Sequence, residues 1–262
     1  MDEFYPVMNR DRPSPCQLRF ENVGLKAPLG PRYLLRSITF SLMPGDRLAI
    51  VGPSGAGKTC LLRLMNRLIE PSEGQIFYGD RPSTDHSIIA LRQSMPLVLQ
   101  EPRLLGMTVR QALIYPLSLR NLKEQDIEQR LTYWVDRLHL PKDWLNLTEV
   151  QLSVGQRQLV AIARALMVQP QMLLLDEPTT ALDVGRRSHL IQTLVNYSQV
   201  NSCTTVMVSH DLDIAQQFCM KLLHLANGRI LNHSLAQNVD WGAVKQSLIQ
   251  AEKDEQAEWD DD

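Results

Sequence analysis

The sequence predicts an α/β fold built around a largely parallel sheet, and three observations lead to this prediction. Short apolar strands alternate with helical patterns along most of the chain. A glycine-rich loop, Gly52 to Thr59, lies between an apolar strand and a helical pattern. Mostly helical patterns cover residues 108–168, which indicates a helical lobe inserted into the alternating pattern. A chain of 262 residues suits one large domain, or one domain that carries such a lobe.

The first half of the chain supplies mainly strands. The segment 34–42 alternates clearly between apolar and polar residues, as a strand with one buried face does. The other segments are short apolar runs, or, after the glycine-rich loop, a run with helical spacing. The expected elements are strands at 17–23, 34–42, 46–52, 74–79 and 94–100, and a helix at 62–69.

The second half begins with the helical lobe and then returns to alternation. A fully apolar segment, 171–176, predicts a buried strand. The remaining elements are expected as helices at 108–119, 124–140, 152–167 and 184–198, a strand at 204–209, a short helix from 211, and a hairpin-like segment at 221–230. We expect one domain over 17–235 with the lobe at about 101–168, a flexible leader at 1–16, and a C-terminal helix with an acidic tail at 236–262.

Composition excludes several classes of protein. The chain has 44% hydrophobic and 21% charged residues, which is typical of a globular protein, and its formal charge of −2 gives no reason to expect a nucleic-acid partner. The four cysteines are scattered, so reduced packing residues are expected in place of disulfides or a zinc site. No apolar run approaches the roughly 20 residues that span a bilayer, so a role at a membrane is expected to be peripheral.

The glycine-rich loop satisfies the pattern G-x-x-x-x-G-K-[ST] in the strand–loop–helix context that the pattern requires. Its backbone N–H groups can surround a β-phosphate, Lys58 can reach the β- and γ-oxygens, and the Thr59 hydroxyl can ligate magnesium. The alternative is a glycine-rich turn with a surface lysine, which these flanking segments disfavour. The expected nucleotide-binding residues are Gly52, Pro53, Ser54, Gly55, Ala56, Gly57, Lys58, Thr59 and Cys60.

Two acidic residues end the apolar strand MLLLDEP. Asp176 is expected beside the loop, where it can hold magnesium directly or through water. Glu177 is one residue further and so is expected on the opposite face of the extended chain, where it can accept a proton from an attacking water. A strand that simply ends in solvated acids is the alternative.

The stretch LSVGQ allows two interpretations. Ser153 and Gln156 form an S-x-x-Q capping box, which marks the beginning of a helix and nothing more in most proteins. Alternatively, Ser153, Gly155 and the exposed amides of the first turn bind a phosphate. The stretch itself does not decide between them.

With GPSGAGKT, LSVGQ, MLLLDEPTTALD and VSH in this order, the sequence resembles the nucleotide-binding subunit of ATP-binding cassette (ABC) transporters over about residues 17–235. The resemblance implies a P-loop NTPase core of mixed, largely parallel sheet, with an antiparallel β subdomain and an inserted helical subdomain that carries the LSxGQ signature. It implies ATP and Mg²⁺ as ligands. It also implies a head-to-tail dimer in which the signature of one subunit closes on the ATP held by the P-loop of the other.

Further roles follow from the resemblance alone. Gln100 is similar to the glutamine that contacts magnesium and the attacking water, and His210 to the switch histidine near the γ-phosphate. Ser153, Gly155 and Gln156 are expected at the partner's nucleotide, and Asp183 is similar to the aspartate that communicates between the two sites. Two departures stand out. Val154 replaces the usual signature glycine, and it either faces away from the nucleotide or weakens the site. The nearest candidate to stack on adenine is Tyr33, which is alternatively a plain strand residue.

One P-loop and one signature, with no long insertion between them, favour a separately encoded transporter subunit. The expected partners are a second cassette subunit, normally another copy of this chain, and an integral membrane subunit that binds near residues 100–108. Exposed Leu104, Leu105 and Met107 would suit that binding groove, although such residues are more often ordinary packing of the helical lobe. The expected location is the cytoplasmic face of the cell membrane. LQEPRLLGMTV and YPLSLRN are similar to stretches of a bacterial cassette subunit proposed for iron export. Two alternatives stay open, a soluble assembly ATPase of the iron–sulfur kind and a nucleotide sensor without hydrolysis.

Overall fold

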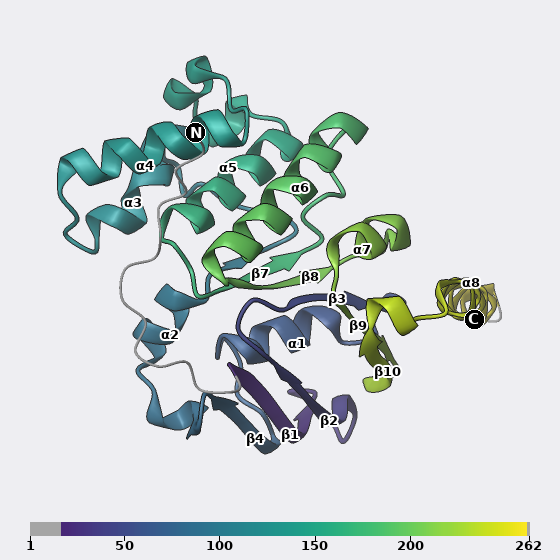
Figure 1. Cartoon of the computed structure of the whole chain (residues 1–262). Coiled ribbons are helices and arrows are strands. Elements are labelled where there is room, and N and C mark those ends of the chain that lie inside the picture. The colour runs from purple at the N-terminus through teal and green to yellow at the C-terminus, as the bar shows by residue number, and fades with distance from the viewer. Residues whose placement is uncertain (1–16, 261–262) are drawn as a thin grey trace.

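The computed structural model describes residues 17–260 as two sheets and surrounding helices (Figure 1). The expected leader, residues 1–16, lies outside the described residues. The strands are β1 Leu18–Lys26, β2 Tyr33–Leu42, β3 Arg47–Val51, β4 Glu73–Tyr78, β5 Arg81–Pro82, β6 Leu97–Val98, β7 Met172–Asp176, β8 Thr204–Val208, β9 Lys221–Ala226 and β10 Arg229–Leu235. The α-helices are α1 Lys58–Met65, α2 Ile88–Ser94, α3 Val109–Ser118, α4 Glu124–Arg137, α5 Val154–Met167, α6 Val184–Asn201, α7 Leu212–Phe218 and α8 Trp241–Asp260.

The two sheets differ in strand direction. The larger has the order β10-β9-β3-β8-β7-β6, with parallel pairing from β9 to β6 and an antiparallel β10 at one edge. The smaller has the order β2-β1-β4-β5 and is antiparallel throughout. The prediction of an α/β fold with a mixed, largely parallel sheet and an antiparallel β unit is confirmed.

The larger sheet separates two apolar cores. Along β3, Ala49 and Val51 belong to the core beneath α3–α7, whereas Leu48 and Ile50 belong to the core shared with α1 and the smaller sheet. Successive side chains of a strand point to opposite faces, so a strand buried on both faces must be apolar at every position. This explains the uninterrupted apolar segments RLAIV and MLLLD. Figure 1 shows helices α3–α7, the helical layer, and the smaller sheet on opposite sides of the larger sheet.

The prediction of a strand over 94–100 is wrong for most of its length. α2 ends at Ser94, and only Leu97 and Val98 pair with β7. Ser87 caps α2 through the N–H of Ala90, so the chain is helical through Ser94, and Pro96 has no N–H to donate to a ladder, although its carbonyl oxygen accepts from the Leu174 N–H. The short β6 leaves residues 99–108 as a connection that leads to the helical layer.

The C-terminal segment, expected as a helix with an acidic tail, contains one long helix. α8 runs from Trp241 to Asp260 and projects from the body (Figure 1), so the acidic segment from residue 251 onward is helical through Asp260. Alanine, glutamate, lysine and glutamine are strong helix formers, and they make up most of this segment. Val244 anchors the beginning of the helix in the core beneath α3–α7.

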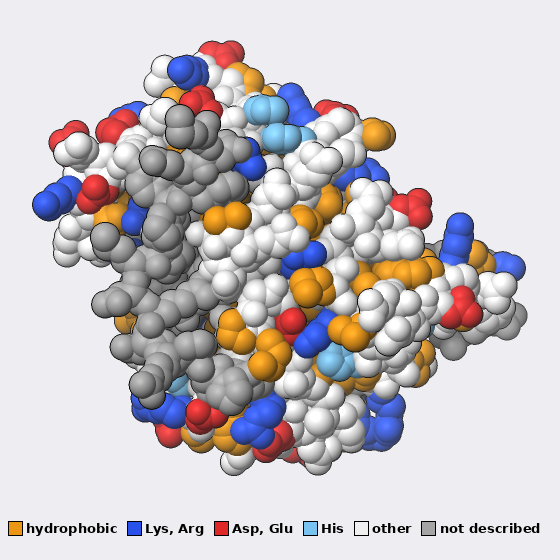
Figure 2. Space-filling view, in the orientation of Figure 1, with side chains coloured by type: hydrophobic (Ala, Val, Ile, Leu, Met, Phe, Trp, Pro, Cys, Tyr) orange, Lys and Arg blue, Asp and Glu red, His pale blue; other side chains and the backbone are white. Residues whose placement is uncertain are grey.

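The surface and the cysteines agree with the composition. Acidic and basic side chains are interspersed on the face drawn in Figure 2, without an extended region of one sign. Within residues 17–260, no helix is long and apolar enough to cross a membrane. The described cysteines are free thiols: Cys203 and Cys219 are buried and Cys60 is half-buried.

Candidate functional site at the strand ends

The expected catalytic residues meet at the carboxyl edge of the larger sheet. The P-loop follows β3, and His210 follows β8. Asp176 ends β7, Glu177 comes directly after it, and Gln100 follows β6. These four strands are parallel neighbours in the order β3-β8-β7-β6, so their carboxyl ends lie along one edge. Residues from four distant parts of the sequence are thereby placed side by side.

The P-loop folds around its own lysine. Lys58 Nζ donates to the carbonyl oxygens of Gly52 at 2.8 Å and Pro53 at 2.7 Å. Gly57 has φ +100° at the N-cap of α1, and a Cβ there would lie 2.7 Å from Leu35 Cδ2 and 2.9 Å from a carbonyl oxygen. Only glycine tolerates both the left-handed φ and this approach. Ser54 and Gly55 are exposed at the tip of the loop, where a phosphate could reach the backbone.

The first turn of α1 and the end of β7 are joined by a hydrogen bond. Thr59 Oγ1 donates to Asp176 Oδ2 at 2.8 Å. Burial raises the pKa of Asp176, and the Thr59 hydrogen bond partly opposes that shift. Cys60, the next residue of α1, has a thiol pKa that burial raises, so it is a poor nucleophile in this position.

Glu177 is the most connected side chain of the site. Its Oε1 lies 2.6 Å from His210 Nε2, and its Oε2 accepts from Gln100 Nε2 at 3.2 Å and from Thr180 Oγ1 at 3.3 Å. The prediction that strand alternation places the Glu177 side chain opposite that of Asp176 is wrong, because the Glu177 backbone has φ +49° and is not extended. β7 ends at Asp176, so a left-handed residue, and not strand alternation, aims the two carboxylates differently.

The stretch LSVGQ begins α5 as the capping-box interpretation requires. Ser153 Oγ accepts from the Gln156 N–H at 3.2 Å, and Gln156 Oε1 accepts from the Ser153 N–H at 2.7 Å. Val154 is the first residue of α5 and is 45% exposed, so its side chain does not disturb the cap. Ser153 is exposed too, whereas Gly155 is buried.

Gly155 packs against the loop that precedes α6. A Cβ at Gly155 would lie 2.3 Å from the carbonyl oxygen of Ala181 and 3.3 Å from Leu182 Cδ2. Asp183 is the N-cap of α6, and its Oδ1 accepts from the Arg186 N–H at 2.9 Å. The signature residues and Asp183 therefore form a second group, held by contacts of their own at the beginnings of α5 and α6.

Comparison with known families identifies this arrangement. The family model described as ABC transporter matches residues 35–180, which contain the P-loop, the signature and the DEP strand end. The chain belongs to the ABC transporter family.

Curated relatives of this cassette are ATP-binding proteins of transporters. The carnitine transport ATP-binding protein OpuCA of Listeria monocytogenes is 31% identical over 82% of this chain and 54% of the relative. The methionine import ATP-binding protein MetN of Xanthomonas euvesicatoria is 35% identical over 75% and 60%, respectively. The arginine transport ATP-binding protein ArtP of Escherichia coli is 34% identical over 79% and 88%. The cassette thus matches little more than half the length of OpuCA and MetN.

Solved structures with the same fold include dimers. A dimeric, post-hydrolysis structure of the ATP-binding cassette MJ0796 bound to ADP and Pi has a TM-score of 0.78 and 26% identity, covering 85% of this chain and all of that one. CbiO1 from Clostridium perfringens, part of the transporter complex cbiONQ, has a TM-score of 0.77 and 27% identity, covering 90% and 94%. The cassette fold of this chain is therefore established over nearly all of the described residues.

Three contacts of the cassette were missed from the sequence. Thr180 reaches the Glu177 carboxylate from three residues further along the chain, across a turn in which the Thr180 N–H also donates to the Glu177 carbonyl oxygen at 3.4 Å. Arg187 and Asp211 form an ion pair of 2.8 Å between α6 and the residue after His210. Nothing in the local sequence pairs them, because they lie 24 positions apart. Tyr33 is a strand residue whose hydroxyl donates to Glu73 Oε2 at 3.3 Å.

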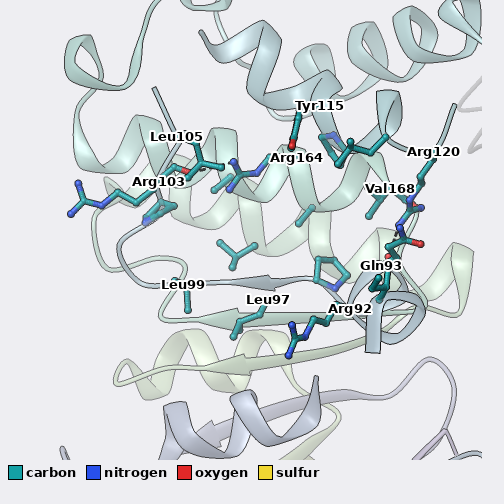
Figure 3. A pocket seen from close by; sticks show the side chains of 18 of the residues that line it. Arg92, Gln93, Leu97, Leu99, Arg103, Leu105, Tyr115, Arg120, Arg164 and Val168 are labelled. Carbon is teal, nitrogen blue, oxygen red and sulfur yellow. Dashed lines mark hydrogen bonds between the residues drawn. The ribbon is translucent and has the colours of Figure 1, made fainter. Parts of the chain in front are cut away.

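A groove of about 560 Å³ lies between α2, the 97–105 segment and the helical layer (Figure 3). Leu105 is 70% exposed and lines it, but the expected exposure of Leu104 is wrong, because that side chain is fully buried. Met107 is half-buried and packs against the core. The groove has an apolar floor and an arginine-rich rim; its lining includes Leu97, Leu99, Leu105, Tyr115, Pro116, Leu119, Ala161, Ala165 and Val168, with Arg92, Arg103, Arg120 and Arg164.

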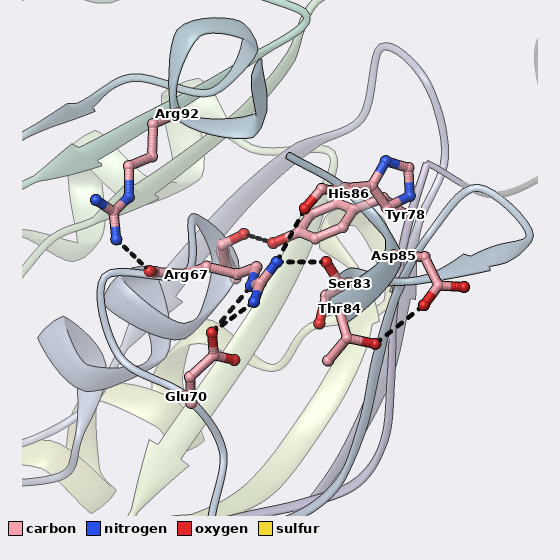
Figure 4. Close-up of polar contacts among 9 residues, drawn as sticks. Arg67, Glu70, Tyr78, Ser83, Thr84, Asp85, His86 and Arg92 are labelled. Atoms are coloured by element: carbon pink, nitrogen blue, oxygen red, sulfur yellow. Dashed lines mark hydrogen bonds and ion pairs between the residues drawn. The ribbon is translucent and has the colours of Figure 1, made fainter. Parts of the chain in front are cut away.

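A polar cluster fixes the α2 wall of this groove to the core (Figure 4). Arg67 donates to the carbonyl oxygen of Ser83 at 2.7 Å and pairs with Glu70 at 2.8 Å, and Arg92 of α2 donates to the carbonyl oxygen of Arg67 at 2.6 Å. The Tyr78 hydroxyl also donates to the carbonyl oxygen of Met65. The segment directly after α1, the helix that begins at the P-loop lysine, is in this way tied to the wall of the groove.

Proposed function

We propose that this chain is the ATP-hydrolysing subunit of a transporter, in which two copies hold two ATP molecules between them and hydrolysis reopens the pair. The observation that carries the proposal is the environment of Glu177, whose carboxylate is held by Gln100, His210 and Thr180 beside the Thr59–Asp176 pair. A carboxylate held in this way is suited to take a proton from an attacking water.

The residues present suit Mg²⁺. The Thr59 hydroxyl and the Asp176 carboxylate are oxygen donors already in contact, and Gln100 offers an amide oxygen because its Nε2 is taken by Glu177. Magnesium prefers oxygen donors of this kind and, when bound, neutralises charge on the β- and γ-phosphates. Lys58 would bind the phosphate oxygens and His210 would orient the γ-phosphate end, so positioning and charge stabilisation dominate the chemistry.

The second group supplies the other half of each site. Ser153, Gly155 and Gln156 stand at the beginning of α5, where exposed N–H groups attract phosphate, and Asp183 stands nearby at the beginning of α6. We place these residues at the nucleotide of the partner copy. ATP then favours the closed pair, and loss of the γ-phosphate removes that preference.

The membrane partner is assigned to the groove at Leu105. An apolar floor suits one face of an amphipathic helix, and the arginine-rich rim favours acidic residues at its ends. We place the assembly on the cytoplasmic face of a membrane. The transport names of OpuCA, MetN and ArtP support transport over the assembly ATPase.

The first test is Mg²⁺-dependent ATP hydrolysis measured against protein concentration. A hydrolysis rate that rises faster than linearly with protein concentration supports a site shared by two copies. The absence of hydrolysis at every concentration contradicts the proposal of a hydrolytic subunit. Purification from membranes separates the alternatives for the partner, because transport requires an integral membrane protein that co-purifies in detergent. Recovery of a soluble scaffold protein alone would instead support the assembly ATPase.

A further inference from the structure

One guanidinium joins the loop before α6 to the loop after β8. Arg187 lies in the second turn of α6, and its Nη1 donates to Asp211 Oδ2 at 2.8 Å. Its Nη2 reaches the carbonyl oxygen of Leu182 at 3.5 Å. The planar fork of arginine allows one side chain to hold both partners, which a single ammonium group cannot do in the same way.

Asp211 uses its two carboxylate oxygens for different contacts. Oδ1 accepts from the N–H groups of Asp213 at 3.0 Å and Ile214 at 3.1 Å, which caps α7, while Oδ2 accepts from Arg187. The Asp211 N–H also donates to Ser209 Oγ at 3.1 Å. His210 therefore stands between two residues that are held by hydrogen bonds, and Arg187 ties one of them, Asp211, to α6.

The other end of the contact leads to the signature. Leu182 is buried, and its N–H donates to the carbonyl oxygen of Thr179 at 3.1 Å. Its neighbour Ala181 has the carbonyl oxygen that leaves no room for a side chain at Gly155. A displacement of the beginning of α5 must therefore move the loop at 181–182, and Arg187 joins that loop to Asp211.

We propose that Arg187 is a positioning residue that couples the signature to His210, and so couples the two ATP sites of the dimer. The inference rests on the proposed function, because the signature meets the nucleotide of the partner copy whereas His210 meets the nucleotide of its own. ATP held by the partner positions α5, the contact at Gly155 positions residues 181–182, and Arg187 positions Asp211 and His210 against Glu177. Arg187 itself touches neither nucleotide.

The test measures ATP hydrolysis of the full chain against ATP concentration. Arg187→Met is expected to lower kcat about 10-fold, to change KM by less than about twofold, and to lower the Hill coefficient toward one. Arg187→Lys keeps the positive charge but not the planar guanidinium, so its kcat and Hill coefficient should lie between those of the parent and those of Arg187→Met. The control is Arg110→Met, which breaks the ion pair between Arg110 of α3 and Glu128 of α4 and alters no residue of either group.

A double-mutant cycle assigns the effect to the pair. Asp211→Asn keeps an oxygen to cap α7 but loses the charge, so its effect and that of Arg187→Met should not add in the double variant. The ion pair is partly exposed, with 28% and 38% of the two side chains accessible, so the variants are expected to fold. If Arg187→Met does not fold, Arg187→Lys and Asp211→Asn carry the same measurement.

The outcomes separate the two proposals. If the parent and Arg110→Met hydrolyse ATP cooperatively while Arg187→Met matches them in kcat and Hill coefficient, the coupling role is overturned. Additive effects in the cycle overturn it equally. If neither the parent nor Arg110→Met hydrolyses ATP, the proposed function fails, and the coupling role with it.

Discussion

Glu177 Oε1 lies 2.6 Å from His210 Nε2, which joins the ends of β7 and β8 at the carboxyl edge of the larger sheet. The same carboxylate accepts from Gln100 through its other oxygen. Gln100 and His210, which lie far from Glu177 in the sequence, thus both contact its carboxylate. Loss of the charge on this carboxylate should lower turnover more than it lowers ATP binding.

Glu177→Gln is expected to retain ATP binding and to lower turnover by about 100-fold or more, because the amide cannot accept the proton. ATP-bound dimer should accumulate. Phosphate release and size-exclusion chromatography with ATP measure both effects, with Glu128→Gln as a surface control. Parental turnover in Glu177→Gln would remove the proposed base.

Lys58→Ala should instead lose nucleotide binding.

Asp176→Asn should stabilise the protein without metal or nucleotide while abolishing Mg²⁺-dependent hydrolysis. Burial raises the pKa of Asp176, so the native state binds more protons than the unfolded state, and stability falls as pH rises from the ordinary aspartate pKa through the raised one. The gain from Asn should thus be absent at acidic pH and present at neutral pH. We expect the Tm measured in EDTA to be higher for Asp176→Asn than for the parent at pH 7. Equal gains at both pH values would contradict the buried charge.

Val154→Gly and Gly155→Ala should differ sharply although the residues are adjacent. Val154 is exposed at the first position of α5, so glycine there should cost at most about 1 kcal/mol and change the hydrolysis rate little. A methyl group at Gly155 meets the carbonyl oxygen of Ala181, so alanine should cost about 1–3 kcal/mol and most of the activity. Urea unfolding and ATPase assays on both variants measure these effects. Restored turnover in Val154→Gly from an inactive parent would show instead that valine disables the signature.

Leu105→Arg should separate partner binding from hydrolysis. The side chain is 70% exposed and lines the groove, so basal ATPase activity should stay within about twofold. Recovery of the membrane partner in detergent should fall at least about 10-fold, because a charge replaces an apolar contact at an interface. Leu231→Arg, on the exposed strand β10, is the matched control. Undiminished recovery with Leu105→Arg would place the partner elsewhere.

Local chemistry made much of the fold and site predictable. The apolar runs of β3 and β7, the glycine-rich turn and the capping box at Ser153 each depend on neighbours within a few residues, and each has the expected form. The errors occur where tertiary contacts decide. Only two residues of the expected 94–100 strand pair with β7, and Leu104, expected at the surface, is buried by packing against the helical layer.

The sequence by itself determined the α/β class, the phosphate-binding loop, the two acidic residues at the carboxyl end of β7, and the family, because each depends on short motifs and their order. Only the tertiary structure decided which atoms meet. Parallel pairing in the order β3-β8-β7-β6 brings Gln100, Glu177 and His210 together, and the close approach of α5 to the loop before α6 makes Gly155 irreplaceable. The ion pair between Arg187 and Asp211 is likewise a contact that only the tertiary structure decides. Such contacts depend on the order of strands and the packing of helices, and these are properties of the whole chain.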